Sequence, residues 1–249
     1  MENYINIIYN PQKNDWKELL RGKNGQPDKT NENGVKLILK NIMESGDKAL
    51  LSYVKIFDNI NIKASELVVS EKEFKEATSK ISNELSYAIN CAISNVKKFH
   101  TAQKSPDISV ETMPGVTCRQ KSIPIGKVGL YIPGGTAPLF STVIMLAVPA
   151  KLAGCKEIVL CTPVNKEGKI APEVLYCAKL CGVDKVYRVG GPAAIAAMAY
   201  GTESIPKVDK IFGPGNSYVT IAKQLISNDI CAIDMPAGPS EVMILADDS

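Results

Sequence analysis

The sequence has very little histidine and arginine. His100 is the only histidine among 249 residues, and 3 of the 29 basic residues are arginines, Arg21, Arg119 and Arg188. A histidine-rich zinc site or a Ser-His-Asp triad built from this sequence alone would therefore have one candidate histidine. Arginine is the side chain whose planar fork reads guanine edges and grips phosphate. Its scarcity, with a net charge of only +3, argues against nucleic-acid binding.

Long hydrophobic runs are lacking as well. The most apolar stretch, residues 143–150, is far shorter than the roughly 20 residues of a membrane-spanning helix. The first ten residues lack the basic and apolar regions of a secretory signal. With 45% hydrophobic and 22% charged residues, the length suffices for one large domain or two smaller ones with real cores. We expect a soluble, unexported protein that makes no membrane contact.

The seven cysteines include no CxxC pair, and they are spread over segments that otherwise have the composition of a core. Free cysteine is among the most buried residue types, so reduced thiols that pack in the interior are the favoured interpretation. A catalytic thiolate would need a neighbour that lowers its pKa, and only lysines lie near these cysteines in sequence. A relative of the aldehyde dehydrogenases with a cysteine nucleophile is the weakest of the functional alternatives.

The first hundred residues are predicted to be mainly helical. Apolar residues recur at helical spacing over 35–42, Gly46 suits a helix C-terminus, and Asp47 can cap a second helix over about 47–57. Ser70 and Glu73 form a capping-box pattern that opens another helix. An apolar stripe over 85–99 then predicts a longer helix that ends near His100.

After about residue 105, short β-type runs alternate with helical segments. Strands are expected at 127–132, 157–161, 185–189, 208–212, 231–235 and 241–246, and helices at 139–152, 172–181, 193–200 and 218–225. Parallel strands need crossover connections, so this alternation indicates a parallel sheet. The predicted fold class is α/β: a helical N-terminal region followed by an incomplete Rossmann-like parallel sheet unit with helices on both faces. Because the last strand-like run is followed by helix-starting residues and no helix, we expect the chain to stop within the fold.

Three turns rich in glycine and proline, at 131–138, 189–192 and 212–217, each follow a predicted strand. Glycine allows close approach of backbone to a ligand, and the helix that follows offers free N–H groups to a phosphate. Together the turns favour a binding cleft at the carboxyl edge of the sheet. The GxGxxG and GxxxxGK[ST] fingerprints are missing, so any nucleotide is held differently. A fourth loop, 234–241, is interpreted equally well as a ligand contact or as a turn closed by its own Asp or Ser.

These loops, in this order, resemble the histidinol dehydrogenase family. The similarity is carried by residues 128–143, 153–161, 206–216 and 233–241, and it extends more weakly to 46–50, 57–58 and 99–104. The resemblance implies a cytoplasmic, homodimeric enzyme of histidine biosynthesis. Such an enzyme oxidises L-histidinol to L-histidine through histidinal, with two hydride transfers to NAD and one zinc per site.

By matched position, the resemblance implies that Tyr131 and Asn216 contact NAD and that Ser240 contacts the substrate. A third NAD contact, a glutamine in the family, falls on Ala193. The family's zinc ligands and its catalytic Glu-His pair lie beyond the position of Ser249, so no catalytic or metal residue is expected in this chain. The implied division is 1–128 for the helical region and first half of domain one, 129–239 for the cofactor-binding domain, and 240–249 for the start of the return to domain one.

Two main hypotheses follow. The first is a histidinol dehydrogenase represented by its N-terminal portion, which is inactive alone for lack of zinc ligands and a catalytic base. The alternative is a non-catalytic nucleotide-binding remnant. Because half of the first domain's sheet would be missing, we also expect an exposed strand edge and self-association of the chain.

Overall fold

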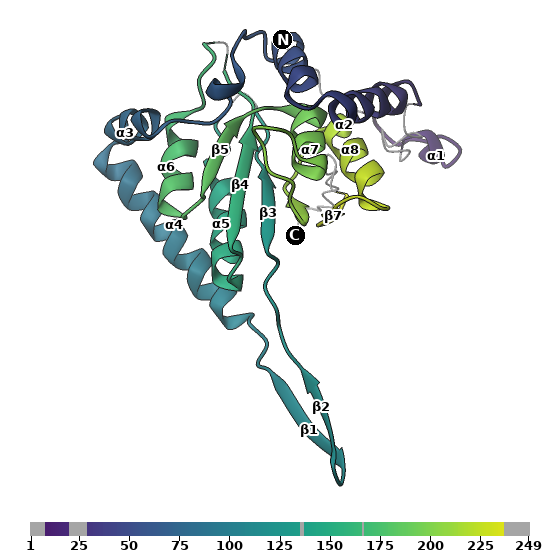
Figure 1. Cartoon of the computed structure of the whole chain (residues 1–249). Helices are drawn as coiled ribbons and strands as arrows, with labels where there is room; N and C mark the ends of the chain where they lie inside the picture. The colour runs from purple at the N-terminus through teal and green to yellow at the C-terminus, as the bar shows by residue number, and fades with distance from the viewer. Residues whose placement is uncertain (1–7, 20–28, 135–136, 166, 237–249) are drawn as a thin grey trace.

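A five-stranded parallel sheet forms the centre of the chain (Figure 1). The computed structural model describes residues 8–19, 29–134, 137–165 and 167–236. The strand order is β5-β4-β3-β6-β7. The bounds are Lys127–Tyr131 for β3, Glu157–Thr162 for β4, Lys185–Arg188 for β5, Lys210–Phe212 for β6 and Ala232–Ile233 for β7.

Helices cover both faces of this sheet, as crossover connections between parallel strands require. One face carries α5 (Phe140–Ala153) and α6 (Pro172–Leu180), and the other carries α7 (Gly191–Tyr200) and α8 (Ser217–Ser227). The predicted α/β class is therefore confirmed, with four strand-helix alternations and a fifth strand. The strand expected at 241–246 lies outside the described residues.

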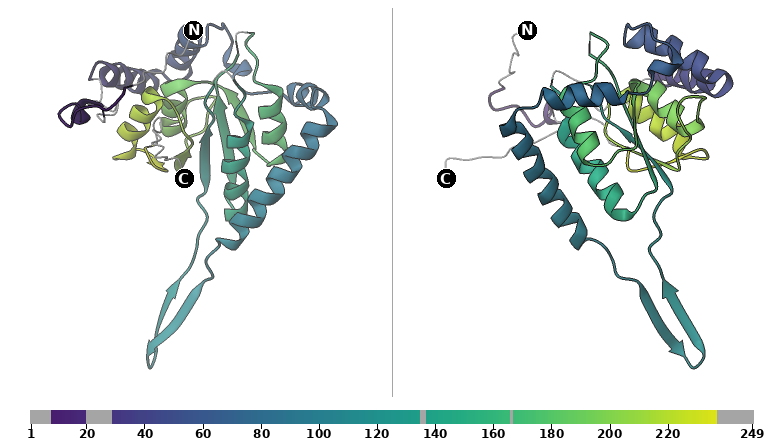
Figure 2. Two further views of the ribbon diagram at one scale, coloured as in Figure 1. Left: turned by 180° about the vertical axis from the view of Figure 1, so that it is seen from behind. Right: turned by 60° about the vertical axis from the view of Figure 1, so that its left-hand side comes forward.

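The N-terminal helices form outer layers on this unit (Figure 2). The long helix α2 (Lys29–Phe57) packs on α7 and α8, whereas α3 (Glu71–Ser79) and α4 (Asn83–Ala102) pack on α6 and α5. Two short elements complete this region, α1 (Trp16–Leu19) and the 3-10 turn η1 (Ala64–Glu66). None of the helices in the described ranges is both long and apolar enough to cross a membrane.

The kink in α2 ties it to the sheet unit. Gly46 has φ +49°, in the left-handed region that glycine tolerates, and it separates two helical halves as the sequence predicts. Asp47, however, does not cap its own helix in the expected way. Its N–H donates to the Glu203 carboxylate at 2.7 Å, and its own carboxylate accepts from the Ser204 amide at 3.3 Å and hydroxyl at 2.5 Å. The cap of the second helical half is thus supplied by the loop that follows α7.

A β-hairpin that the sequence analysis did not predict projects from the body of the molecule (Figures 1 and 2). It consists of β1 (Ile108–Met113) and β2 (Val116–Gln120), which pair antiparallel with every residue exposed. Val110 lies opposite Cys118, and since alternate side chains share a face, the same face carries Ile108 and Val116. This face of the hairpin therefore exposes three apolar side chains, those of Ile108, Val110 and Val116, beside the polar Thr112 and Gln120.

Candidate functional site

The connections of the sheet reverse direction between β3 and β6. The chain leaves β3 toward α5 and β4 on one side, and it leaves β6 toward α8 and β7 on the other. In open α/β sheets, ligands bind outside the carboxyl ends of the strands at such a reversal. The first and third glycine turns, 131–138 and 212–217, follow these two neighbouring strands, so they flank the expected binding position.

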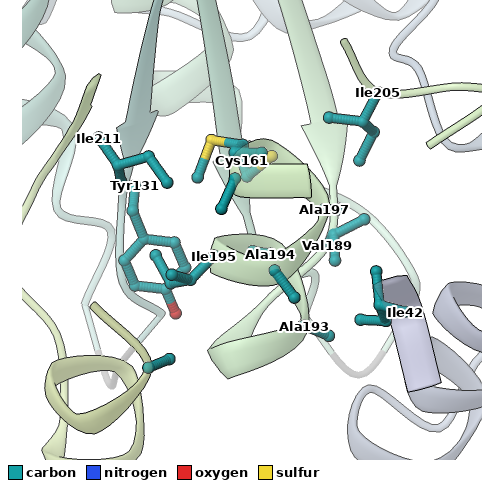
Figure 3. Close-up of a cluster of buried hydrophobic side chains, with 14 of the residues drawn as sticks. Ile42, Tyr131, Cys161, Val189, Ala193, Ala194, Ile195, Ala197, Ile205 and Ile211 are labelled. Carbon is teal, nitrogen blue, oxygen red and sulfur yellow. The ribbon is translucent and has the colours of Figure 1, made fainter. Parts of the chain in front are cut away.

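Tyr131, the last residue of β3, links the three glycine turns. Its side chain is buried beside Ile195 of α7 (Figure 3), and its hydroxyl accepts a hydrogen bond from the Gly191 amide at 3.0 Å. Its carbonyl oxygen lies against Gly213, where an added Cβ would be 2.1 Å away. Burial raises the pKa of the hydroxyl to about 12, so the group keeps its proton at neutral pH and remains a hydrogen-bond donor.

Asp58 fixes the second glycine turn. The residue follows the end of α2, and its half-buried carboxyl group accepts a hydrogen bond from the Gly190 amide. Burial raises its pKa to about 6, while the bond from Gly190 works in the opposite direction. The charge of Asp58 also contributes to raising the pKa of Tyr131, which places the two groups in one electrostatic neighbourhood.

Asn216 begins α8 and closes the third turn. Its side chain accepts the Val219 N–H at 3.1 Å, which satisfies one of the amides that a helix N-terminus leaves unpaired. The amide nitrogen of the same side chain provides two donors. Asn216 can therefore cap the helix through its oxygen and donate to a ligand through its nitrogen.

Two hollows lie at opposite ends of the sheet. One of about 190 Å³ borders the first glycine turn and includes Pro133, Gly134 and Pro163 in its lining. Another, of about 600 Å³ and largely apolar, lies near the amino ends of β3 and β4 and includes His100 and Cys155. The smaller hollow lies at the carboxyl edge, where ligands of open α/β sheets bind, but it is lined by the segments after β3 and β4 and does not reach Asn216.

The cysteines do not form a nucleophilic site. Burial raises the pKa of five of them, Cys155, Cys161, Cys177, Cys181 and Cys231, which disfavours the reactive thiolate. The two exposed cysteines are Cys91 and Cys118, and they lie on α4 and on the hairpin rather than in the glycine turns. This placement counts against the cysteine-nucleophile alternative.

Metal-binding side chains do not converge within the part of the chain that the structure describes. There, no three His, Cys, Asp or Glu residues are grouped so that they could hold a metal ion. The one histidine, His100, lies in the last turn of α4 with its ring edge-on to Phe99. The described residues therefore do not fit a zinc centre, and no step that uses a metal can be derived from them.

Comparison with known proteins identifies the family. A family model described as histidinol dehydrogenase matches residues 22–249. The chain belongs to the histidinol dehydrogenase family. Histidinol dehydrogenase of Bacteroides thetaiotaomicron is 55% identical over 248 residues, which are 98% of this chain and 56% of that protein. Histidinol dehydrogenase of Escherichia coli K12 is 56% identical over 212 residues, 84% of this chain and 48% of that protein.

A solved structure agrees with this assignment. The crystal structure of histidinol dehydrogenase from Elizabethkingia anophelis matches with a TM-score of 0.84 and 49% identity, over 93% of this chain and 53% of that chain. The fold described above is therefore that of the matching part of a histidinol dehydrogenase. The chain spans about half the length of the curated relatives it matches.

The structure describes two of the three residues that the resemblance implies contact NAD or the substrate. Tyr131 and Asn216 belong to the turns after the neighbouring strands β3 and β6, whereas Ser240 lies outside the described residues. Ala193, the position of the family's glutamine, is buried in the first turn of α7. A buried methyl group there offers no polar contact to a ligand.

Two residues that hold the glycine turns, Asp58 and Lys223, were not predicted from the sequence. Nothing in the pattern around Asp58 indicated its bond to Gly190, because the partners are far apart in sequence. Lys223 did leave a signal: it falls in the buried row of α8 together with Val219, Ala222 and Ile226. A lysine at such a position needs a specific partner.

Proposed function

We propose that this chain carries the NAD-binding half of a histidinol dehydrogenase, which oxidises L-histidinol to L-histidine through histidinal. Residues 129–239 form the cofactor-binding unit in this proposal, and the dinucleotide lies across the carboxyl edge of the sheet. The observation that carries the proposal is the reversal between β3 and β6, flanked by the turns of Tyr131 and Asn216.

The turns suit a dinucleotide because they pack closely together at the carboxyl edge of the sheet. An added Cβ would lie 2.6 Å from Pro163 at both Gly134 and Gly190, so glycine at these positions lets the first and second turns pack against the residue that follows β4. The N-terminus of α8 follows the third turn and provides backbone N–H groups for phosphate. In this proposal the Tyr131 hydroxyl and the Asn216 side-chain amide each donate a hydrogen bond to the cofactor. When bound, NAD supplies the acceptor for the hydride removed from the substrate.

The chain itself holds the cofactor and part of the substrate contact, through Ser240, but it does not perform the oxidation alone. The described residues hold no zinc centre, and the resemblance assigns the zinc ligands and the catalytic Glu-His pair to the part of the family's chain after position 249. In the cytoplasmic, homodimeric enzyme that the resemblance implies, those groups complete the site. A nucleotide-binding remnant without chemistry is the alternative.

Isothermal titration of the 249-residue chain with NAD tests the cofactor site. We expect saturable binding, weakened about tenfold by Asn216→Ala, because one hydrogen bond to the ligand is lost. Ser82→Ala is the matched control, since Ser82 caps α4 by accepting the Leu85 N–H at 3.1 Å, as Asn216 caps α8. Both variants lose about 1 kcal/mol of cap energy, but only Asn216→Ala should lose NAD affinity. Equal NAD affinity in the two variants would show that Asn216 does not contact NAD.

Turnover separates the two hypotheses about the chemistry. With histidinol and zinc added, we expect no NADH production by the purified chain. A fusion of this chain to the C-terminal part of a histidinol dehydrogenase should produce NADH if the first hypothesis holds and should not if the remnant hypothesis holds. NADH production by the 249-residue chain alone would overturn the proposal that this chain binds the cofactor but does not catalyse the oxidation.

A further inference from the structure

Lys223 lies where a helix facing the sheet normally places a hydrophobic residue. Its side chain is almost fully buried on α8. A buried ammonium group is costly unless every donor finds an acceptor. The Lys223 Nζ donates to the Gly213 carbonyl at 2.7 Å, to the Asp234 carboxylate in a short ion pair, and to the Met235 carbonyl at 3.4 Å. Three donors meet three acceptors, so Lys223 has no donor left over for a ligand phosphate.

Asp234, directly after β7, completes a clamp on Gly213. One carboxylate oxygen pairs with Lys223, and the other accepts the Gly213 N–H at 2.9 Å. Both backbone polar groups of Gly213 are therefore held by the pair. On its other side Gly213 lies against the Tyr131 carbonyl, and its φ of +129° belongs to a region that residues with a side chain rarely adopt. The first residue of the third glycine turn is thus fixed from two directions.

We propose that Lys223 and Asp234 are positioning residues that fix the turn 213–216 and so aim Asn216 and the N-terminus of α8 at the dinucleotide. The proposal rests on the NAD-binding function proposed above. Two glycines give this turn wide backbone freedom, which a ligand would otherwise have to restrict at a cost in affinity. A buried ion pair adds little net stability compared with apolar residues of similar volume. Its contribution here is the orientation of the turn.

Replacing both partners separates positioning from stability. Lys223→Met leaves the Asp234 carboxylate without its cation, so we expect a lower melting temperature and NAD binding about tenfold weaker or worse. In the double variant Lys223→Met/Asp234→Leu, no unpaired charge remains. We expect its melting temperature to return toward that of the unsubstituted chain while NAD binding stays weak. Hydrogen exchange of the Gly213 amide should be faster in both variants.

Ser204→Ala provides a matched control. It also deprives a buried carboxylate, that of Asp47, of a hydrogen-bond partner, but it lies in the loop before β6, at the opposite edge of the sheet. We expect a lower melting temperature with unchanged NAD affinity and unchanged Gly213 exchange. This pattern shows that instability alone does not weaken binding.

The outcomes distinguish this proposal from the proposed function. If the unsubstituted chain does not bind NAD, the proposed function fails, and unchanged Gly213 exchange in the double variant would separately overturn the clamp. If the unsubstituted chain binds NAD and the double variant binds it equally well, the positioning role is overturned. Failure of the double variant to fold would also overturn it, because the pair would then be required for the fold itself.

Discussion

Removing the charge of Asp58 should stabilise the folded chain near neutral pH. Burial against the turn 189–191 raises the pKa of this carboxyl group from 3.8 to about 6. Between these values the folded chain binds a proton that the unfolded chain has released, so stability falls as pH rises through this window and stays lower above it. Asp58→Asn keeps an oxygen acceptor for the Gly190 amide and cannot ionise. The free energy of unfolding of this variant therefore does not fall as the pH rises through this window.

The magnitude follows from the two pKa values. Their difference corresponds to about 3 kcal/mol for a fully buried group, and because the carboxyl group is only half-buried, solvent screening reduces this to about 1–2 kcal/mol. Urea unfolding from about pH 4 to pH 8 measures the effect. Asp58→Asn should be more stable by that amount above about pH 7, and the two proteins should converge near pH 4.

Asp229→Asn is the control for this experiment, because it removes the charge of an exposed aspartate near the end of α8. We expect it to change the unfolding free energy by less than about 0.5 kcal/mol at every pH. If Asp58→Asn is no more stable than the unsubstituted chain near neutral pH, the burial argument for Asp58 is wrong.

Three further predictions concern other parts of the chain. Gly213→Ala would place a methyl group 2.1 Å from the Tyr131 carbonyl oxygen, so we expect a loss of about 2–4 kcal/mol in urea unfolding; a loss below about 0.5 kcal/mol would contradict the close approach. Ellman's reagent should label two of the seven thiols quickly, those of Cys91 and Cys118, and the five buried thiols only on unfolding. Fast labelling of a buried thiol would show that the helix or strand that carries it opens in the folded chain. The exposed apolar side chains of the hairpin should make copies of the chain associate. Val110→Lys should weaken this association and lower the mass measured by light scattering. An unsubstituted chain that is already monomeric would refute this.

The elements of the sheet unit could be predicted because their signals are local. Periodicity and flanking turns placed each strand and helix of this unit, from β3 to β7, within a few residues of its observed bounds. The capping box of Ser70 and Glu73 is present as expected. The hairpin was missed although Pro114 and Gly115 form a turn signal, because its exposed strands lack the continuous apolar runs of the buried ones.

The contacts that shape the candidate site were beyond local reasoning. Asp58 reaches Gly190, and Glu203 caps the second half of α2, across large separations in sequence. The sequence left two interpretations open for the loop that begins at Asp234, a ligand contact or a turn closed by its own side chain. In the structure the Asp234 carboxylate instead binds Gly213 and Lys223, which lie outside that loop. Such contacts depend on which strands become neighbours, and a pattern of single residues does not contain that information.

Strand order gives the assignment of Tyr131 and Asn216 a basis that residue matching lacks. A family resemblance carries residue identities from one sequence to another, but it gives no reason why those two positions should act together. The sheet supplies that reason: β3 and β6 are adjacent although two strands lie between them in the chain, and the connections leave them in opposite directions. Ligands of open parallel sheets bind outside the carboxyl ends of the strands at such a reversal. Tyr131 and Asn216, in the segments that follow these two strands, are therefore candidates for ligand contact from their place in the sheet, independently of the family.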